Sequence, residues 1–268
     1  MKTLGFIGGG NMATAIIAGA LRAKHCAASD VIVSEPDAER QAAVRELGVE
    51  VVWDNAIVAR NARTLVLAVK PQMMVQALAS LRDELDVAKT LVVSIAAGAP
   101  IATIAADLPT GARVIRVMPN TPLLVGAGMS VLCAGPRATA DDLNAAEALL
   151  AAGGETLTLP EDSFDAVTAV SGSGPAYVFL LAEALAEAGR NAGLPNDAAR
   201  RLARQTVIGA GRLLAESPDD ATELRLKVTS PGGTTEAALA VLETAGFRRL
   251  MTDAVRAATE RGRELGAK

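Results

Sequence analysis

Apolar residues in the first part of the chain come in short, nearly continuous runs, which is typical of strands covered on both faces of a sheet. We predict strands at residues 4–7, 31–33, 49–53, 64–69, 90–95, 113–118, 128–133 and 155–159. Amphipathic stretches between them predict helices at residues 12–23, 37–47, 100–108 and 140–152. Strands that alternate with helices predict an α/β fold with a doubly wound, mostly parallel sheet.

After Pro160 the strand pattern stops and only Ala-rich helical segments follow. They are predicted at residues 162–170, 176–192, 195–215, 222–229, 235–244 and 247–265. We therefore expect two domains, at residues 1–160 and 161–268. Residues 177–188 are apolar around much of the helix circumference, so this helix requires burial on more than one side.

So small a helical domain cannot bury two-sided helices within itself, because surface area grows relative to volume as domains shrink. We expect a homodimer through the helical domain, and a higher oligomer of such dimers is compatible with the same pattern. Small side chains such as Ala182, Ala186 and Gly209 would allow close helix approach. The alternative is that the long helices pack against the sheet of the first domain.

Composition narrows the classes of function. The net charge is −4 and no basic tract is present, which argues against a nucleic-acid partner. No apolar run of membrane-spanning length and no signal-peptide pattern is present, so we expect a cytoplasmic protein without a membrane partner. The cysteines Cys26 and Cys133 have no metal-ligand spacing, and no metal is expected. The only histidine, His25, lies at a predicted helix end, so the chemistry must proceed without histidine.

The first predicted strand runs directly into Gly8-Gly9-Gly10 and then into a helix. Gly8, Gly10 and Ala13 match the dinucleotide-binding turn of a Rossmann-type domain. Gly8 permits the tight turn, Gly10 lets a pyrophosphate approach the backbone, and Ala13 allows close packing of helix on strand. The helix N-terminus adds free N–H groups for the phosphates. The alternative is a purely structural glycine turn.

The second strand ends at Ser34-Glu35, where this fold meets the adenosine ribose. An acid there favours a free 2′-hydroxyl, whereas a hydroxyl with a nearby arginine suits a 2′-phosphate. Ser34, Glu35 and Arg40 leave both options open. We expect the Glu35 carboxylate to repel a 2′-phosphate and so to blunt discrimination between the two donors, and Glu35→Gln should therefore shift the kcat/KM ratio toward NADPH.

Two further glycine turns precede helices in the second domain, at residues 171–177 and 230–236. Each offers backbone N–H and hydroxyl donors that suit a carboxylate. Ordinary helix capping explains much of the first turn, where Pro175 begins the helix. In the second turn, Thr234 and Thr235 after two glycines exceed what a cap requires.

Five stretches resemble the pyrroline-5-carboxylate reductase family over the whole length of the chain. They are residues 5–13, 68–71, 116–122, 165–177 and 228–239, the last of which reads Val-Thr-Ser-Pro-Gly-Gly-Thr-Thr-Glu-Ala-Ala-Leu. The resemblance implies reduction of L-1-pyrroline-5-carboxylate to L-proline, the last step of proline biosynthesis, with NADPH the usual donor and NADH also possible. It also implies that the helical domains of two chains interlock.

The resemblance also implies the site residues. The cofactor would be bound by Gly8, Gly10, Asn11, Met12, Ser34, Asn55, Ala68, Lys70, Pro71, Ala96 and Ala97. The substrate would be bound by Ser230, Gly232, Gly233, Thr234 and Thr235, with Thr235 the catalytic residue.

Two other functions fit parts of the sequence. A β-hydroxyacid dehydrogenase shares the two-domain plan, but it uses a lysine of the helical domain, and here that domain has only Lys227 and Lys268. A non-catalytic dinucleotide-sensing protein would keep the first glycine turn but would not need Thr234 and Thr235. Reduction of a protonated cyclic imine requires position, a dry pocket and a hydrogen-bond partner for the ring nitrogen, and no histidine.

Overall fold

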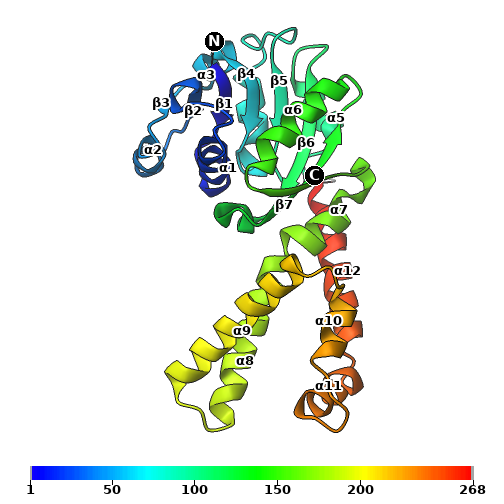
Figure 1. Ribbon diagram of the computed structural model, residues 1–268. Helices are drawn as coiled ribbons and strands as arrows, with labels where there is room; N and C mark the ends of the chain where they lie inside the picture. The colour runs from blue at the N-terminus through cyan, green and yellow to red at the C-terminus, as the bar shows by residue number, and fades with distance from the viewer. Residues whose placement is uncertain (1, 267–268) are drawn as a thin grey trace. The chain divides into compact units, whose positions relative to one another are not determined.

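The computed structural model describes residues 2–266, and its first part is built on one eight-stranded sheet (Figure 1). The strands are β1 (Lys2–Ile7), β2 (Val31–Ser34), β3 (Glu50–Val52), β4 (Ala62–Leu67), β5 (Leu91–Ser94), β6 (Arg113–Pro119), β7 (Gly128–Ala134) and β8 (Gly154–Thr158). Their order is β3-β2-β1-β4-β5-β6-β7-β8, and only the β6–β7 pair is antiparallel. The predicted doubly wound, mostly parallel sheet is confirmed.

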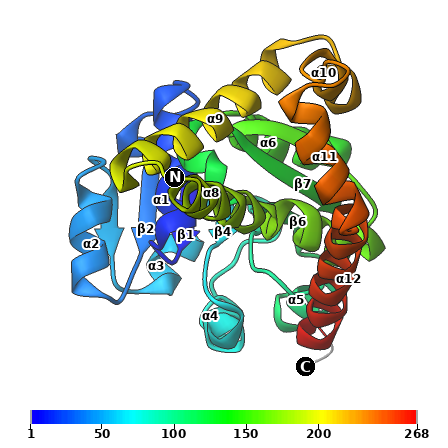
Figure 2. The same cartoon turned by 90° about the horizontal axis from the view of Figure 1, so that it is seen from below.

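Helices cover both faces of this sheet, as Figure 2 shows. They are α1 (Asn11–Arg22), α2 (Ala38–Arg45), α3 (Asn55–Asn61), α4 (Met74–Ala79), α5 (Ile101–Asp107), α6 (Ala140–Ala151) and α7 (Phe164–Val167). One core cluster joins the strands to α1 and α6, and a second joins them to α3, α4 and α5. Successive strand residues alternate between the two clusters: Phe6 faces α1, whereas Ile7 faces the other side.

The chain divides into two compact units, and the first extends to Gly172 and includes residues 258–266. It reaches past the predicted boundary at 160 because the segment after β8 packs onto the sheet. Phe164 of α7 is buried in the core. The π-helix η5 (Thr168–Gly172) lies against β6, so closely that a Cβ on Gly172 would be 2.4 Å from Met118 Cε.

The second unit, residues 173–257, contains helices and no strand within the part of the chain that the structure describes. It holds α8 (Gly174–Asn191), α9 (Asn196–Glu216), α10 (Ala221–Lys227), α11 (Thr234–Thr244) and the first part of α12 (Phe247–Gly266). Helices α8 and α9 lie side by side (Figures 1 and 2), so closely that a Cβ on Gly189 would be 3.3 Å from Ala199 Cβ. Little of this unit is buried, and the all-helical prediction is confirmed.

Candidate dinucleotide and substrate sites

The first glycine turn connects β1 to α1, and Gly8 is the residue that no other amino acid could replace without strain. Its φ is +97°, a region that favours glycine. A Cβ there would lie 2.7 Å from the carbonyl oxygen of Ala68. The Gly8 N–H donates to the Ser34 carbonyl at 2.8 Å, which ties the turn to the end of β2. Gly8 therefore shapes the turn, as its position in the motif predicts.

Gly10 differs from Gly8, because a Cβ on Gly10 would have no protein atom within 4 Å. Its φ of −70° and ψ of 178° are open to any residue, so the backbone does not require glycine there. Gly10 is also the N-cap of α1, and no side chain caps this helix. The first N–H groups of a helix of 12 residues therefore remain available to an anion. This open, uncapped turn fits a dinucleotide pyrophosphate.

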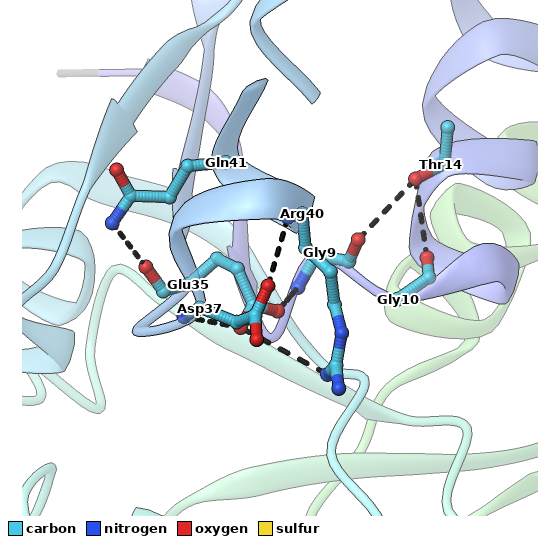
Figure 3. Close-up of polar contacts among 7 residues, drawn as sticks. All are labelled: Gly9, Gly10, Thr14, Glu35, Asp37, Arg40 and Gln41. Atoms are coloured by element: carbon cyan, nitrogen blue, oxygen red, sulfur yellow. Dashed lines mark hydrogen bonds and ion pairs between the residues drawn. The ribbon is translucent and has the colours of Figure 1, made fainter. Parts of the chain in front are cut away.

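Glu35 follows β2 and turns into the glycine turn (Figure 3). It is 2% exposed. Its Oε2 accepts the Gly9 N–H at 2.8 Å, and its Oε1 accepts the Asp37 N–H at 3.0 Å. The Arg40 guanidinium lies 3.9 Å from Oε1. The expected repulsion between Glu35 and a 2′-phosphate does not fit this geometry: both carboxylate oxygens face backbone N–H groups, because a buried charge requires hydrogen-bond partners.

Ser34 and Asn55, the two residues predicted at the adenosine end, are brought together. The Ser34 hydroxyl donates to Asn55 Oδ1 at 2.6 Å, and Asn55 Nδ2 donates to Ser80 Oγ at 3.0 Å. Ser34 is 1% exposed, whereas Asn55 is partly exposed at the start of α3. Ser80, which sequence reasoning missed, completes this chain of hydrogen bonds from α4; no local sequence signal indicates it.

The remaining predicted cofactor residues follow three neighbouring parallel strands. Asn11 and Met12 begin α1 after β1; Ala68, Lys70 and Pro71 follow β4; Ala96 and Ala97 follow β5. These positions lie at the carboxyl edge of the sheet, where ligands of such folds bind. The loop after β4 is joined to β1 by the Ala68 N–H, which donates to the Ile7 carbonyl at 2.9 Å. The structure therefore brings these segments to one edge.

The predicted substrate turn precedes α11 in the second unit. Gly233 is the N-cap of α11, and no side chain accepts the first N–H groups of this helix. Gly232 has a φ of +71°, and the Gly233 N–H donates to the Ser230 carbonyl at 3.0 Å. Thr234 is exposed and Thr235 is partly exposed. The turn therefore offers uncapped N–H groups beside two hydroxyls, which suits a carboxylate.

One donor of this turn already has a partner. The Gly232 N–H donates to Glu236 Oε2 at 2.7 Å. The Gly232 N–H is therefore satisfied within the protein, as in ordinary helix capping. No side chain caps the first N–H groups of α11, which is the arrangement expected for ligand binding.

Asn120, at the end of β6, organises the earlier glycine turn. Its Nδ2 donates to the Ser171 carbonyl and hydroxyl, both at 3.2 Å, and its Oδ1 accepts the Met129 N–H at 2.9 Å. The first of the two serine-glycine turns is therefore attached to the sheet through the π-helix η5. Such π-helical turns frequently occur at functional sites.

A doubly wound sheet with an open glycine turn at a helix N-terminus defines a dinucleotide-binding protein. Comparison with known proteins narrows this class. Residues 3–98 match the family described as NADP oxidoreductase coenzyme F420-dependent, and residues 161–265 match pyrroline-5-carboxylate reductase dimerisation. Among described residues, no group of three or more His, Cys, Asp or Glu could hold a metal ion.

Relatives that match nearly the whole chain belong to the same family as the dimerisation region. A pyrroline-5-carboxylate reductase of Synechocystis sp. is 47% identical over 266 residues, covering 99% of this chain and 98% of its own. The structure of a Coxiella burnetii pyrroline-5-carboxylate reductase superposes with a TM-score of 0.92 at 39% identity, covering 98% of both chains. A Plasmodium falciparum pyrroline carboxylate reductase with NADP bound has a TM-score of 0.86 at 29% identity, covering 99% of this chain and 98% of its own. The chain belongs to the pyrroline-5-carboxylate reductase family.

Proposed function

We propose that this protein uses NAD(P)H to reduce L-1-pyrroline-5-carboxylate to L-proline, the last step of proline biosynthesis. The observation that carries the proposal is the turn before α11, where an uncapped helix N-terminus lies beside Thr234 and Thr235. A dinucleotide-sensing protein has no use for this turn. The near full-length identity with reductases of the family supports the same activity.

The proposed roles of the residues follow from what each offers. The N–H groups at the start of α1 hold the pyrophosphate, and the open side of Gly10 lets it approach the backbone. Asn55, oriented by Ser34 and Ser80, faces the adenosine end. The residues after β4 and β5 line the nicotinamide ribose. When bound, the dinucleotide supplies the hydride.

The substrate carboxylate is bound by the turn from Ser230 to Gly233 and by the first N–H groups of α11. The Thr235 hydroxyl hydrogen-bonds the ring nitrogen and so fixes the carbon that accepts the hydride. The imine nitrogen takes its proton from solvent before binding, so the protein does not need to supply an acid. His25, the only histidine, lies at the exposed end of α1 and has no part in this chemistry.

The assay that tests the proposal offers purified protein pyrroline-5-carboxylate with NADPH, and separately with NADH, and follows dinucleotide absorbance and proline formation. We expect proline with both donors. A parallel reaction offers 3-hydroxy acids with NADP⁺. Turnover of the hydroxy acids alone would establish a β-hydroxyacid dehydrogenase, and tight dinucleotide binding without turnover would establish a sensor.

We also propose a cytoplasmic homodimer formed through the second unit. The apolar side chains of α8 are exposed, and none of its residues is buried; Phe179 is 61% exposed and Leu180 64%. The stretch Glu161–Asn191 has the length and composition of a membrane span. Because the match to the family's dimerisation region begins at this stretch, we assign its apolar surface to a second copy rather than to a bilayer.

Sedimentation at decreasing protein concentration, with activity followed in parallel, tests the dimer. We expect activity to disappear as the dimer dissociates. A fully active species at the monomer mass of 27.4 kDa would contradict the proposed assembly.

A further inference from the structure

Glu35 is one of two acidic residues that are buried among the described residues, and the other has an obvious partner. Asp142 lies 2.6 Å from the Arg113 guanidinium and belongs to the capping box of α6. Glu35 has only Arg40 at 3.9 Å, and the side chain of Arg40 is 53% exposed. The Glu35 charge is therefore balanced chiefly by the two backbone N–H groups that it accepts, from Gly9 and Asp37.

The contact between Glu35 and the glycine turn is one of packing as well as hydrogen bonding. A Cβ on Gly9 would lie 2.9 Å from Val44 Cγ2 and 3.3 Å from Glu35 Cβ, so the turn rests directly on the stem of Glu35. The Gly8 N–H is already donated to the Ser34 carbonyl. The N–H groups of Gly8 and Gly9 thus both donate hydrogen bonds to residues at the end of β2, Ser34 and Glu35.

The same carboxylate fixes the loop that follows β2. Its Oε1 accepts the Asp37 N–H, and the Glu35 carbonyl accepts Gln41 Nε2 at 2.6 Å. Asp37 in turn caps α2, where its Oδ1 accepts the Arg40 N–H at 2.9 Å (Figure 3). The Glu35 carboxylate therefore joins the turn that precedes α1 to the Asp37 N–H, and the Glu35 carbonyl and the Asp37 side chain continue these contacts into α2.

From this geometry we propose that Glu35 is a positioning residue for dinucleotide binding, and not a reader of the ribose. It holds Gly9 so that the free N–H groups begin at Gly10 and continue into α1, where the pyrophosphate is bound. Because the Glu35 side chain is 2% exposed and both of its carboxylate oxygens face backbone N–H groups inside the protein, Glu35 neither reaches a ribose 2′-hydroxyl nor directs its charge at a 2′-phosphate. This inference rests on the dinucleotide use in the proposed function.

The two roles predict opposite patterns of binding. A ribose reader that is lost weakens NAD⁺ and leaves or strengthens NADP⁺, because the removed carboxylate contacted only the free 2′-hydroxyl. A positioning residue that is lost weakens both dinucleotides alike, because the pyrophosphate is common to both. The ratio of the two dissociation constants therefore separates the roles, whatever the absolute affinities are.

The experiment measures dissociation constants of NADP⁺ and NAD⁺ by titration calorimetry for wild-type protein, Glu35→Gln and Glu35→Ala. Glu39→Gln is the matched control, because Glu39 is an exposed acid in the first turn of α2 and its change removes the same charge. Hydrogen exchange of the Gly9 amide, followed by NMR in the dinucleotide-free protein, reports the turn independently of binding.

We expect Glu35→Ala to raise both dissociation constants about tenfold, the worth of a hydrogen bond to a charged group, with the NADP⁺ to NAD⁺ ratio changed by less than about twofold. The Gly9 amide should exchange faster. Glu35→Gln nearly preserves shape and keeps one oxygen for Gly9, but its NH₂ cannot accept the Asp37 N–H, so its effects should be intermediate. Glu39→Gln should change neither quantity.

Three results would overturn the inference. One is selective loss of NAD⁺ binding in the Glu35 variants, which is the pattern of a ribose reader. Another is lower stability with unchanged dissociation constants, which is the pattern of a merely structural residue. The third is unchanged binding with an unchanged Gly9 exchange rate. Wild-type protein that bound neither dinucleotide would instead refute the proposed function itself, and the inference with it.

Discussion

Alanine substitutions at Gly8 and Gly10 should separate the two requirements that the glycine turn meets. At Gly10 the added methyl group meets no protein atom within 4 Å, and the backbone is already in a region open to alanine. At Gly8 the methyl group would lie 2.7 Å from the Ala68 carbonyl oxygen at a φ of +97°. The methyl group of Gly10→Ala therefore lies in empty space, whereas that of Gly8→Ala overlaps a backbone atom and the residue is held in a strained conformation.

The magnitudes follow from these surroundings. For Gly10→Ala, the poorer N-cap costs about 0.5–1 kcal/mol and the stiffer unfolded chain returns about 0.4–1 kcal/mol, so the free energy of unfolding should stay within about 0.5 kcal/mol of wild type. For Gly8→Ala, backbone strain of about 1–3 kcal/mol adds to an overpacking cost of about 1–3 kcal/mol. We expect a loss of about 2–6 kcal/mol there.

Gly10→Ala should keep its stability but lose affinity for the dinucleotide. The Gly10 methyl group occupies the space through which the pyrophosphate approaches, and crowding of about 1–3 kcal/mol raises the NADP⁺ dissociation constant about 5- to 150-fold. Urea unfolding and titration calorimetry on the same preparations measure both quantities. Wild-type affinity in Gly10→Ala would refute the argument that the pyrophosphate lies against this backbone.

Three further changes test other parts of the molecule. Thr235→Ala should lower kcat/KM about 10- to 1000-fold with little change in stability, and Thr235→Ser should recover most of the activity; wild-type kinetics in the alanine variant would remove Thr235 from the mechanism. Glu161→Ala should cost about 1–3 kcal/mol in urea unfolding, because the Glu161 carboxylate accepts from both buried Arg116 and the Ile101 N–H at the start of α5; a loss below about 0.5 kcal/mol would contradict this account. Burial, and then the Glu161 charge, raise the pKa of the Cys133 thiol above its ordinary value of 9.0. The thiol therefore ionises at lower pH in the unfolded chain than in the folded protein, and the free energy of unfolding should fall as pH rises past about 9. This fall, measured between about pH 8 and about pH 10, should be smaller in Cys133→Ala, and an equal fall in the variant would disprove the role of Cys133.

The sheet and the glycine turn could be predicted because their signals are local. Most strands are apolar runs bounded by polar or glycine residues, and the requirement for Gly8 comes from the backbone of the turn itself. The helices α3 and α4 were missed because they are short, with 7 and 6 residues, and carry too few apolar positions for a helical period to stand out. The first compact unit reaches Gly172, beyond the predicted boundary at residue 160, whereas the matched dimerisation region begins at residue 161. Contacts of Phe164 and Gly172 with the sheet depend on packing that no local pattern reveals.

Glu35 is where sequence reasoning reached the right place and assigned the wrong orientation. The end of β2 was placed where this fold meets the adenosine ribose, and in the structure it lies beside the glycine turn because β1 and β2 pair. Which way the side chain points depends on the free N–H of Gly9, a residue 26 positions earlier that the motif treats as variable. Once β1 and β2 pair, that N–H lies inside the protein and requires an acceptor, because an unpaired buried donor is costly. The Glu35 carboxylate meets this requirement, so its charge is explained by the backbone of the turn before any ligand is considered.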